Sequence, residues 1–282
     1  MGYALSGAGF AVLLSAAWSD VLIAAILSLV VYAVVLLAER LKWVAHRLEM
    51  SSAFVVSVLA NAIAIITPGS NPFVVTLCAV IVLIPGLALT LGLAEVLAKH
   101  IDSGISRLVD GVMVTLKLFL GAAIGHVLVN AIQAVPDAVV PPGIPAVWTW
   151  LFVALLVVGL AIVFQVRTKD FGWTVLGGLL AYAGIAIGNQ FGFWQGSFIG
   201  ALFLSIYSNL FAWRLGRPTS IVMLTAIMVL VPGAAAYRGL HVAETSGITS
   251  GLSAEWHVLI NIAAIIAGLV VAYSVIPPKA TL

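Results

Sequence analysis

The chain alternates long apolar runs with short polar breaks over almost its whole length. A helix needs roughly 20 residues to cross a bilayer, and the runs are of about this length. They are continuously apolar, so they favour membrane helices over the strands of a β-barrel. The pattern predicts an all-α integral membrane protein with ten transmembrane helices, at residues 3–17, 20–38, 51–66, 72–98, 104–133, 146–166, 171–188, 194–213, 219–241 and 252–276.

The basic residues are placed unevenly among the breaks. Lys and Arg lie in every second break, starting with the one after the second helix, and again in the C-terminal tail. The remaining breaks contain neither residue. Basic loops of membrane proteins stay preferentially in the cytoplasm. The alternation therefore predicts a multi-pass protein of the cell's inner (plasma) membrane with both termini in the cytoplasm.

The composition agrees with a surface that faces lipid. Of the 282 residues 63% are hydrophobic and 8% are charged, and the mean hydropathy is +1.23. Ten helices leave no room for a folded soluble domain, and the segment 2–17 lacks the basic region of a cleaved signal peptide. The net charge of +2 argues against a nucleic-acid partner, and the single Cys78 cannot form an intrachain disulfide.

Two segments of the chain resemble each other at a constant offset. Residues 77–104 match residues 224–251, and the shared positions include Pro-Gly at 85–86 and 232–233, a later Gly, and a Ser-Gly pair. Each half then holds five helices, and an odd number makes the second half enter the membrane from the opposite side. We therefore predict two inverted-topology repeats, at residues 1–134 and 146–276, separated by a Pro-rich connection.

The two Pro-Gly pairs fall inside otherwise continuous apolar helices, the fourth and the ninth. Proline removes a backbone donor, and irregular backbone at this depth is tolerated where it is buried in protein or lines a cavity. Each pair would start a half-helix whose N-terminus favours an anion. The prediction is a carboxylate site near Gly86, Thr90, Gly233 and Tyr237; the alternative is a pair of kinked helices whose backbone bonds are repaired by neighbours.

Charged residues within the helices add candidates to this site. Lys117 and Arg238 are the candidate counter-charges for a carboxylate, because charge inside a membrane helix usually lines a cavity or pairs. Lys117 could instead pair with Asp110, seven residues earlier, and Arg238 could extend to the outer headgroups. Glu95 and Asp110 are the candidate carriers of a coupling proton.

Other polar residues point to packing more than to chemistry. His126 with Asn130, and His257 with Asn261, have helical i, i+4 spacing, and we interpret them, together with Asn61, as sources of interhelical hydrogen bonds. No ligand cluster of metal-site spacing, phosphate loop or catalytic triad is present in the sequence. We therefore expect no enzyme activity, no cofactor and no metal.

The segments around both Pro-Gly pairs resemble the threonine/serine exporter family, which includes exporters of small dicarboxylates. The resemblance rests on IPGLALTLGLAEVLAKHIDSGISRL, on VPGAAAYRGL and on the opening GAGFAVLLSAAWSD. It implies ten membrane helices and proton-coupled export. The chain departs from the family in carrying Glu95 where Asp is usual, and in lacking a soluble region before the first helix, which a partner would then supply unless this is a shorter variant or fragment.

Together these features predict a secondary transporter that exports a small carboxylate-bearing solute by alternating access. The solute would be threonine, serine or a dicarboxylate, and protons and the lipid bilayer would be its other partners. The sequence leaves open whether the protein forms a homo-oligomer or binds a partner subunit. The alternative from another class is a non-transporting membrane subunit or scaffold of a larger complex.

Overall fold

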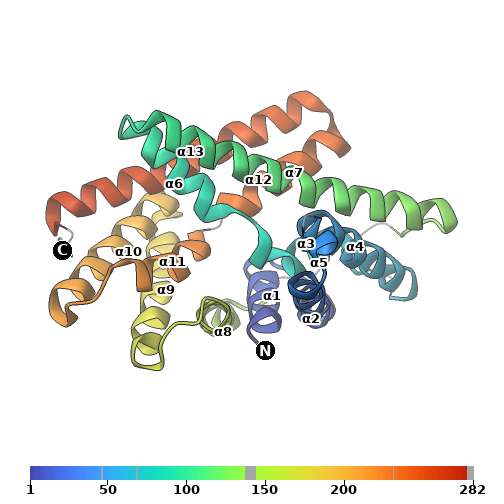
Figure 1. Cartoon of the computed structure of the whole chain (residues 1–282), viewed down its shortest axis with the longest axis horizontal. Coiled ribbons are helices and arrows are strands. Elements are labelled where there is room, and N and C mark those ends of the chain that lie inside the picture. The colour runs from blue at the N-terminus through green and yellow to red at the C-terminus, as the bar shows by residue number, and fades with distance from the viewer. Residues whose placement is uncertain (46, 68, 137–143, 231, 278–282) are drawn as a thin grey trace. The chain divides into compact units, whose positions relative to one another are not determined.

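The computed structural model describes residues 1–45, 47–67, 69–136, 144–230 and 232–277. Over these ranges every regular element is a helix (Figure 1). Most of the predicted Pro-rich connection, 135–145, and the C-terminal tail lie outside the described residues.

Each of the ten predicted apolar runs folds as helix. Length and apolar character qualify seven helical stretches among the described residues as membrane spans, and one of them, 220–243, contains the second Pro-Gly pair. An eighth is added if α5 (Pro72–Ala79) and α6 (Gly86–Leu97), which are bent by 54° at their break, count together as one span. The other two runs form the shorter apolar helices α1 (Gly2–Leu13) and α8 (Ala146–Val163), and α1 has only 12 residues. A membrane-spanning helix needs about 17 residues or more. The chain is therefore a multi-pass membrane protein, and the number of ten spans stays a prediction.

The helices gather into two compact units that are discontinuous along the chain. The first comprises residues 1–84 and 114–163, and the second comprises 85–113 and 164–282. Each unit takes helices from both sequence halves. The first unit contains α1 (Gly2–Leu13), α2 (Trp18–Arg40), α3 (Lys42–Ala45), α4 (Leu48–Ile66), α5 (Pro72–Ala79), η1 (Ile81–Leu83), the later part of α7 (Ile101–Ile132) and α8 (Ala146–Val163).

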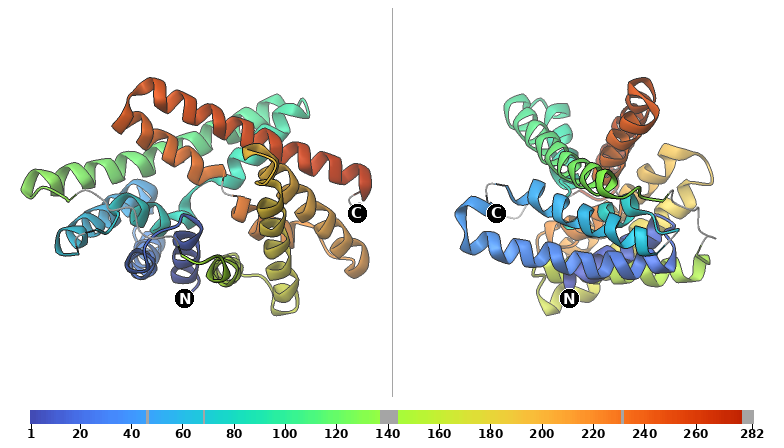
Figure 2. Two further views of the ribbon diagram at one scale, coloured as in Figure 1. Left: turned by 180° about the vertical axis from the view of Figure 1, so that it is seen from behind. Right: turned by 90° about the vertical axis from the view of Figure 1, so that its right-hand side faces the viewer.

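The second unit holds the helices that follow both Pro-Gly pairs. It contains α6 (Gly86–Leu97), the start of α7, α9 (Thr168–Gly188), α10 (Phe193–Leu215), α11 (Ser220–Ala226), η2 (Ile227–Leu230), α12 (Pro232–Ser246) and α13 (Ile248–Val275). Figure 2 shows α12 and α13 as a hairpin at the orange-to-red end of the chain.

Both Pro-Gly pairs interrupt their helices, as predicted. In the fourth run α5 tightens into the 3₁₀ turn η1, and α6 begins at Gly86 with Pro85 as its N-cap residue. In the ninth run α11 passes into the 3₁₀ turn η2, and α12 begins at Pro232. Proline has no N–H to continue the helix before it and is tolerated in the first turn of a new one, which explains the position of both breaks.

The matched segments make matching contacts in the second unit. In the hairpin of α6 and α7, a Cβ added to Gly92 would meet the side chain of Leu108 at 2.9 Å. In the hairpin of α12 and α13, a Cβ added to Gly239 would meet the side chain of Glu255. Both members of the second pair lie 147 residues after those of the first, the offset of the sequence match. At Gly92 the added Cβ would also lie 3.0 Å from the Gly104 carbonyl oxygen, so glycine lets the backbones of α6 and α7 approach, whereas Gly239 lies against the Glu255 side chain alone.

Candidate functional site

The two half-helices that begin at the Pro-Gly pairs, α6 and α12, pack together in the second unit. Leu89 of α6 and Ala236 of α12 belong to one buried apolar cluster, which α13 completes with Val258, Ile262 and Ile266. Leu89 and Ala236 are also separated by 147 residues. Equivalent positions of the two matched segments therefore share one core, and the predicted site residues of α6 and α12 lie on neighbouring helices.

The start of α6 is buried and held by its own side chains. Gly86 is buried, and Thr90 is completely buried. The Thr90 hydroxyl donates to the Gly86 carbonyl over 2.9 Å. The first turn of a helix presents N–H groups that lack partners within the helix. The Thr90 hydroxyl is thus directed at the Gly86 carbonyl and stabilises the turn that displays these groups.

On α12, Gly233 lies in the first turn, and Tyr237 and Arg238 follow one turn later. Tyr237 is completely buried, whereas Arg238 is exposed. Arg238 lines a cavity of about 340 Å³ between α12 and α13, together with His257 and Asn261. The arrangement places a guanidinium group and an amide at the wall of one cavity, which are groups that bind a carboxylate or a carbonyl.

The first hairpin has an ion pair where the second has this cavity. Glu95 of α6 accepts from Arg107 of α7 at 2.9 Å, and its side chain is 27% exposed. The positions 147 residues later are Val242 and Ala254, and both line the cavity beside Arg238. Small apolar side chains at these two positions leave open the space that charged side chains fill in the first hairpin.

Glu95 also lies at the edge of a larger and mainly apolar cavity. This cavity measures about 760 Å³ and is lined by residues of α6, α11 and α13, with His100, Ser220 and Tyr273 as further polar groups. The Glu95 Oε2 atom is buried and makes no hydrogen bond with the described residues. One carboxylate oxygen is therefore neutralised by Arg107 while the other remains without a donor.

The two remaining candidates, Asp110 and Lys117, are not among the residues that line these two cavities. Asp110 is exposed on α7. Lys117 belongs to the first unit, where its Nζ lies 3.8 Å from Glu49 Oε2 of α4. The alternative pairing of Lys117 with Asp110 is therefore wrong. Seven residues of helix separate those two by about 10 Å along the axis, whereas Glu49 approaches Lys117 from a neighbouring helix.

One member of each polar pair chosen for packing joins two helices, whereas Asn130 accepts from the nearby Val135 N–H. His126 Nδ1 lies 2.7 Å from Asn61 Oδ1, which links α7 to α4, and Ser197 donates to Asn261 to link α10 to α13. The bond found for His257 stays within α13, to the Ser253 carbonyl. Among the described residues no group of three or more His, Cys, Asp or Glu side chains could hold a metal ion.

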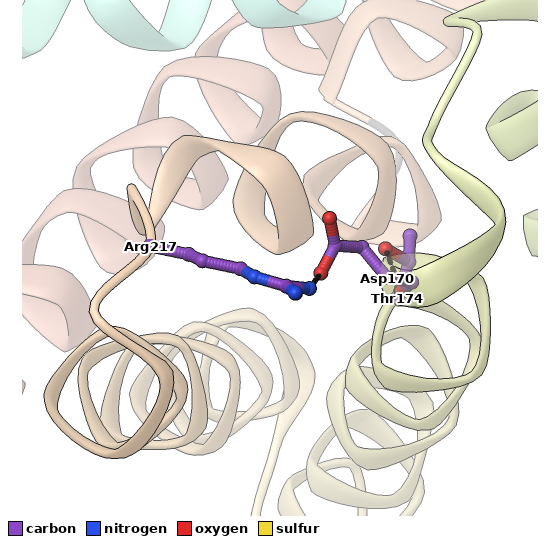
Figure 3. A network of polar contacts seen from close by, with 3 residues as sticks. All are labelled: Asp170, Thr174 and Arg217. Atoms are coloured by element: carbon purple, nitrogen blue, oxygen red, sulfur yellow. Dashed lines mark hydrogen bonds and ion pairs between the residues drawn. The ribbon is translucent and has the colours of Figure 1, made fainter.

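Sequence reasoning missed two buried acids, Asp20 and Asp170, that are 1% and 2% exposed. Asp20 accepts from the Ser70 hydroxyl at 2.6 Å and from the Asn71 N–H at 3.3 Å. Asp170 forms an ion pair with Arg217, as Figure 3 shows. Each acid is the third residue of its helix, and an acid there usually complements the helix dipole in water. Only their burial distinguishes them, and no spacing in the sequence predicts it.

Comparisons with known proteins give matches over most of the chain. Two family models that describe threonine/serine exporters match the chain, one over residues 1–129 and the other over residues 149–275. The chain is 29% identical over 243 residues to "Pheromone-regulated membrane protein 10" of Yarrowia lipolytica. That match covers 80% of this chain and 20% of the yeast protein, so the chain spans about a fifth of its relative's length. No solved structure matches the chain.

Proposed function

Because the chain belongs to the threonine/serine exporter family, we propose that it is a secondary transporter that exports a small carboxylate-bearing solute. The solute is threonine, serine or a dicarboxylate, and export is driven by protons. The observation that carries the proposal is the pair of interrupted helices. Their second halves, α6 and α12, share one apolar core, and Arg238 opens onto a cavity beside them. Transporters commonly bind their solutes at discontinuous helices of this kind.

The proposed architecture is two inverted repeats of five helices, at residues 1–134 and 146–276, in the inner membrane with both termini in the cytoplasm. The contacts that recur at an offset of 147 residues support it. So does the position of the two family matches, one in each half. The alternating basic loops support the orientation. Transport would then proceed as the halves rock about a fixed site.

In the proposed site the solute carboxylate binds the N–H groups at the starts of α6 and α12, near Gly86, Thr90 and Gly233. Arg238 supplies the counter-charge, and Tyr237, which is completely buried, stays a candidate contact next to it. Lys117 remains a candidate for a second counter-charge, in competition with its pairing to Glu49. A guanidinium group with an amide beside it suits a carboxylate, because it offers several donors in one plane.

Glu95 is the better of the two candidate proton carriers. It is half-buried, has one oxygen without a donor, and keeps Arg107 as its cation. Protonation of Glu95 would release Arg107, and such a change of partner can couple a proton to the movement of helices. Asp110 is exposed and has a weaker claim.

A flux assay in proteoliposomes tests the proposal. The purified chain is reconstituted, and efflux of labelled threonine, serine and succinate is measured with and without a pH gradient. We expect at least one solute to move and the gradient to accelerate it. If the folded protein moves none of the three solutes, and none of them dissipates the pH gradient, the chain does not export these solutes. The alternative, a non-transporting subunit or scaffold, is then favoured.

A further inference from the structure

The large cavity beside Glu95 is lined mostly by apolar side chains, and the proposed transport uses none of them. It measures about 760 Å³ and is formed by α6, α11 and α13 within the second unit. Sites for small molecules commonly have volumes of about 300–1,000 Å³. A charged, water-soluble solute would find few polar partners along these walls, so the large cavity suits a ligand that is itself mainly apolar.

The polar groups of the large cavity lie where its helices end or begin. His100 follows the end of α6, Ser220 is the first residue of α11, and Tyr273 lies in the last turn of α13. The opposite end is apolar. There Leu87 follows the break at Gly86, and Ile227 marks the point where α11 passes into η2. The large cavity therefore runs from a polar end to the interruptions of both broken helices.

The sequence assigns the polar end to one side of the membrane. Each of the three connections or tails at this end contains a basic residue, namely Lys99, Arg217 and Lys279. Basic segments of this kind stay preferentially in the cytoplasm. Three separate parts of the chain thus place the polar end at the cytoplasmic headgroups.

The length of the large cavity matches one leaflet of a bilayer. The lining of α13 extends from Ala263 to Tyr273, and that of α6 from Leu87 to Leu97. Each stretch rises by about 15 Å at 1.5 Å per residue. The hydrocarbon core of a bilayer is about 30 Å thick. An acyl chain that starts at the headgroups would therefore reach the helix breaks near the midplane.

The open side of the large cavity faces the bilayer. Its lining includes Leu97, Val270 and Val271, which are 61%, 56% and 42% exposed. Exposed apolar side chains on membrane helices contact lipid tails, which are as apolar as leucine. A lipid can therefore enter the large cavity sideways without passing through water.

Glu95 provides a partner for a particular headgroup. Its Oε1 pairs with Arg107 at 2.9 Å, while its buried Oε2 makes no hydrogen bond with the described residues. A buried acceptor without a donor costs free energy, and an ammonium group would supply the donor. Sites for anionic lipids are instead lined by Lys and Arg, and the described lining of the large cavity contains neither.

We propose that the large cavity binds a phospholipid of the cytoplasmic leaflet that carries a primary ammonium headgroup. One acyl chain lies along α13 and ends at the helix breaks. The ammonium group donates to Glu95, and the phosphate accepts from the hydroxyls of Ser220 and Tyr273. The site does not depend on transport, whereas its leaflet rests on the orientation proposed above.

Photo-crosslinking of full-length protein in phosphatidylcholine vesicles tests the inference. The vesicles contain traces of phosphatidylethanolamine or phosphatidylglycerol, with the same photoreactive group in one acyl chain, and mass spectrometry identifies the labelled peptides. We expect phosphatidylethanolamine to label α6 and α13 about tenfold more than phosphatidylglycerol. Glu95→Gln should keep the labelling and lose this preference, because its amide no longer carries the charge that attracts the ammonium group.

Two matched variants test the position of the acyl chain. Ala267 is exposed on α13 and lines the large cavity, so Ala267→Trp fills the space and should lower the labelling about tenfold. Ala33, exposed on α2 of the first unit, undergoes the same change outside the cavity. Ala33→Trp should therefore label like wild type. Melting temperatures in detergent check that both variants fold.

Each remaining outcome contradicts part of the inference. Labelling spread evenly over all apolar helices, or unchanged in folded Ala267→Trp, would exclude a lipid site here. Equal labelling by both lipids would exclude the ammonium headgroup. No label in the cavity of a protein that elutes as a dimer would assign this face to a second copy. The assay needs no solute, so specific labelling of a protein that fails in the flux assay would overturn the exporter and leave the lipid site standing.

Discussion

Asp20 and Asp170 are each the third residue of a helix, each is buried, and each binds the segment that leads into an interrupted helix. Asp20 accepts hydrogen bonds from Ser70 and Asn71, which precede α5. Asp170 forms an ion pair with Arg217, which precedes α11. In the proposed inverted arrangement, α2 and α9 begin at opposite faces of the membrane. The two acids would then anchor the broken helices at opposite faces.

The anchoring role of Asp20 predicts a loss of stability on its removal. Asp20→Ala leaves the buried Ser70 hydroxyl and the Asn71 N–H without an acceptor, which costs about 1–3 kcal/mol. Thermal unfolding in detergent measures the effect. Ser70→Ala removes one donor and keeps the acid, so it should lower the melting temperature less. An Asp20→Ala protein that melts with wild type would show that the acid does not anchor this segment.

The close backbone contact in the first hairpin predicts a steric cost at Gly104. A Cβ there would lie 2.7 Å from the Gly92 carbonyl oxygen, so Gly104→Ala must push α7 away from α6. Overpacking of this kind costs about 1–3 kcal/mol. Gly172→Ala is the matched control, because nothing lies within 4 Å of its added Cβ. Equal melting temperatures for the two variants would show that α6 and α7 do not pack this closely at Gly104.

The pairing of Lys117 with Glu49 predicts a rescue by charge exchange. Lys117→Glu sets two carboxylates against each other at the start of α4, and like charges this close disfavour each other's ionised form. We expect the single variant to lose folded yield and Glu49→Lys with Lys117→Glu to recover it. Yield is read from fluorescence-detected gel filtration. A double variant as poor as the single one would mean that the two side chains do not interact.

The role assigned to Glu95 predicts an uncoupled transporter. Glu95→Gln keeps the side-chain size but cannot carry a proton, so transport driven by a pH gradient should fall to the rate without a gradient while solute exchange continues. Asp102→Asn, an exposed acid at the start of α7, serves as the control and should keep both rates. A Glu95→Gln protein that still responds to the gradient would exclude Glu95 as the carrier.

The helices could be predicted from the sequence because their cause is local. Each apolar run is long enough to require internal backbone bonding in lipid, and Pro85 and Pro232 mark where that bonding stops. The matched contacts of Gly92 and Gly239 likewise follow from residues that can be aligned by eye. Local composition and spacing thus determined the elements and their interruptions.

The ion pairs could not be predicted because they depend on packing between distant segments. Lys117 has Asp110 on its own helix, yet it pairs with Glu49 of α4. Asp170 and Arg217 are 47 residues apart and have no sequence pattern that joins them. The compact units, which mix helices of both halves, have the same origin, since they are set by which apolar faces meet.

The most direct test of the exporter with a carboxylate site at Arg238 is counterflow of labelled threonine into proteoliposomes, with wild type, Arg238→Ala and Arg214→Ala compared at equal protein content. Arg214, in the last turn of α10, loses the same charge outside the site. Wild type and Arg214→Ala should accumulate the label, and Arg238→Ala should be slower by about 30-fold or more. Wild-type counterflow by folded Arg238→Ala, or none by wild type with threonine, serine or succinate, would contradict the account.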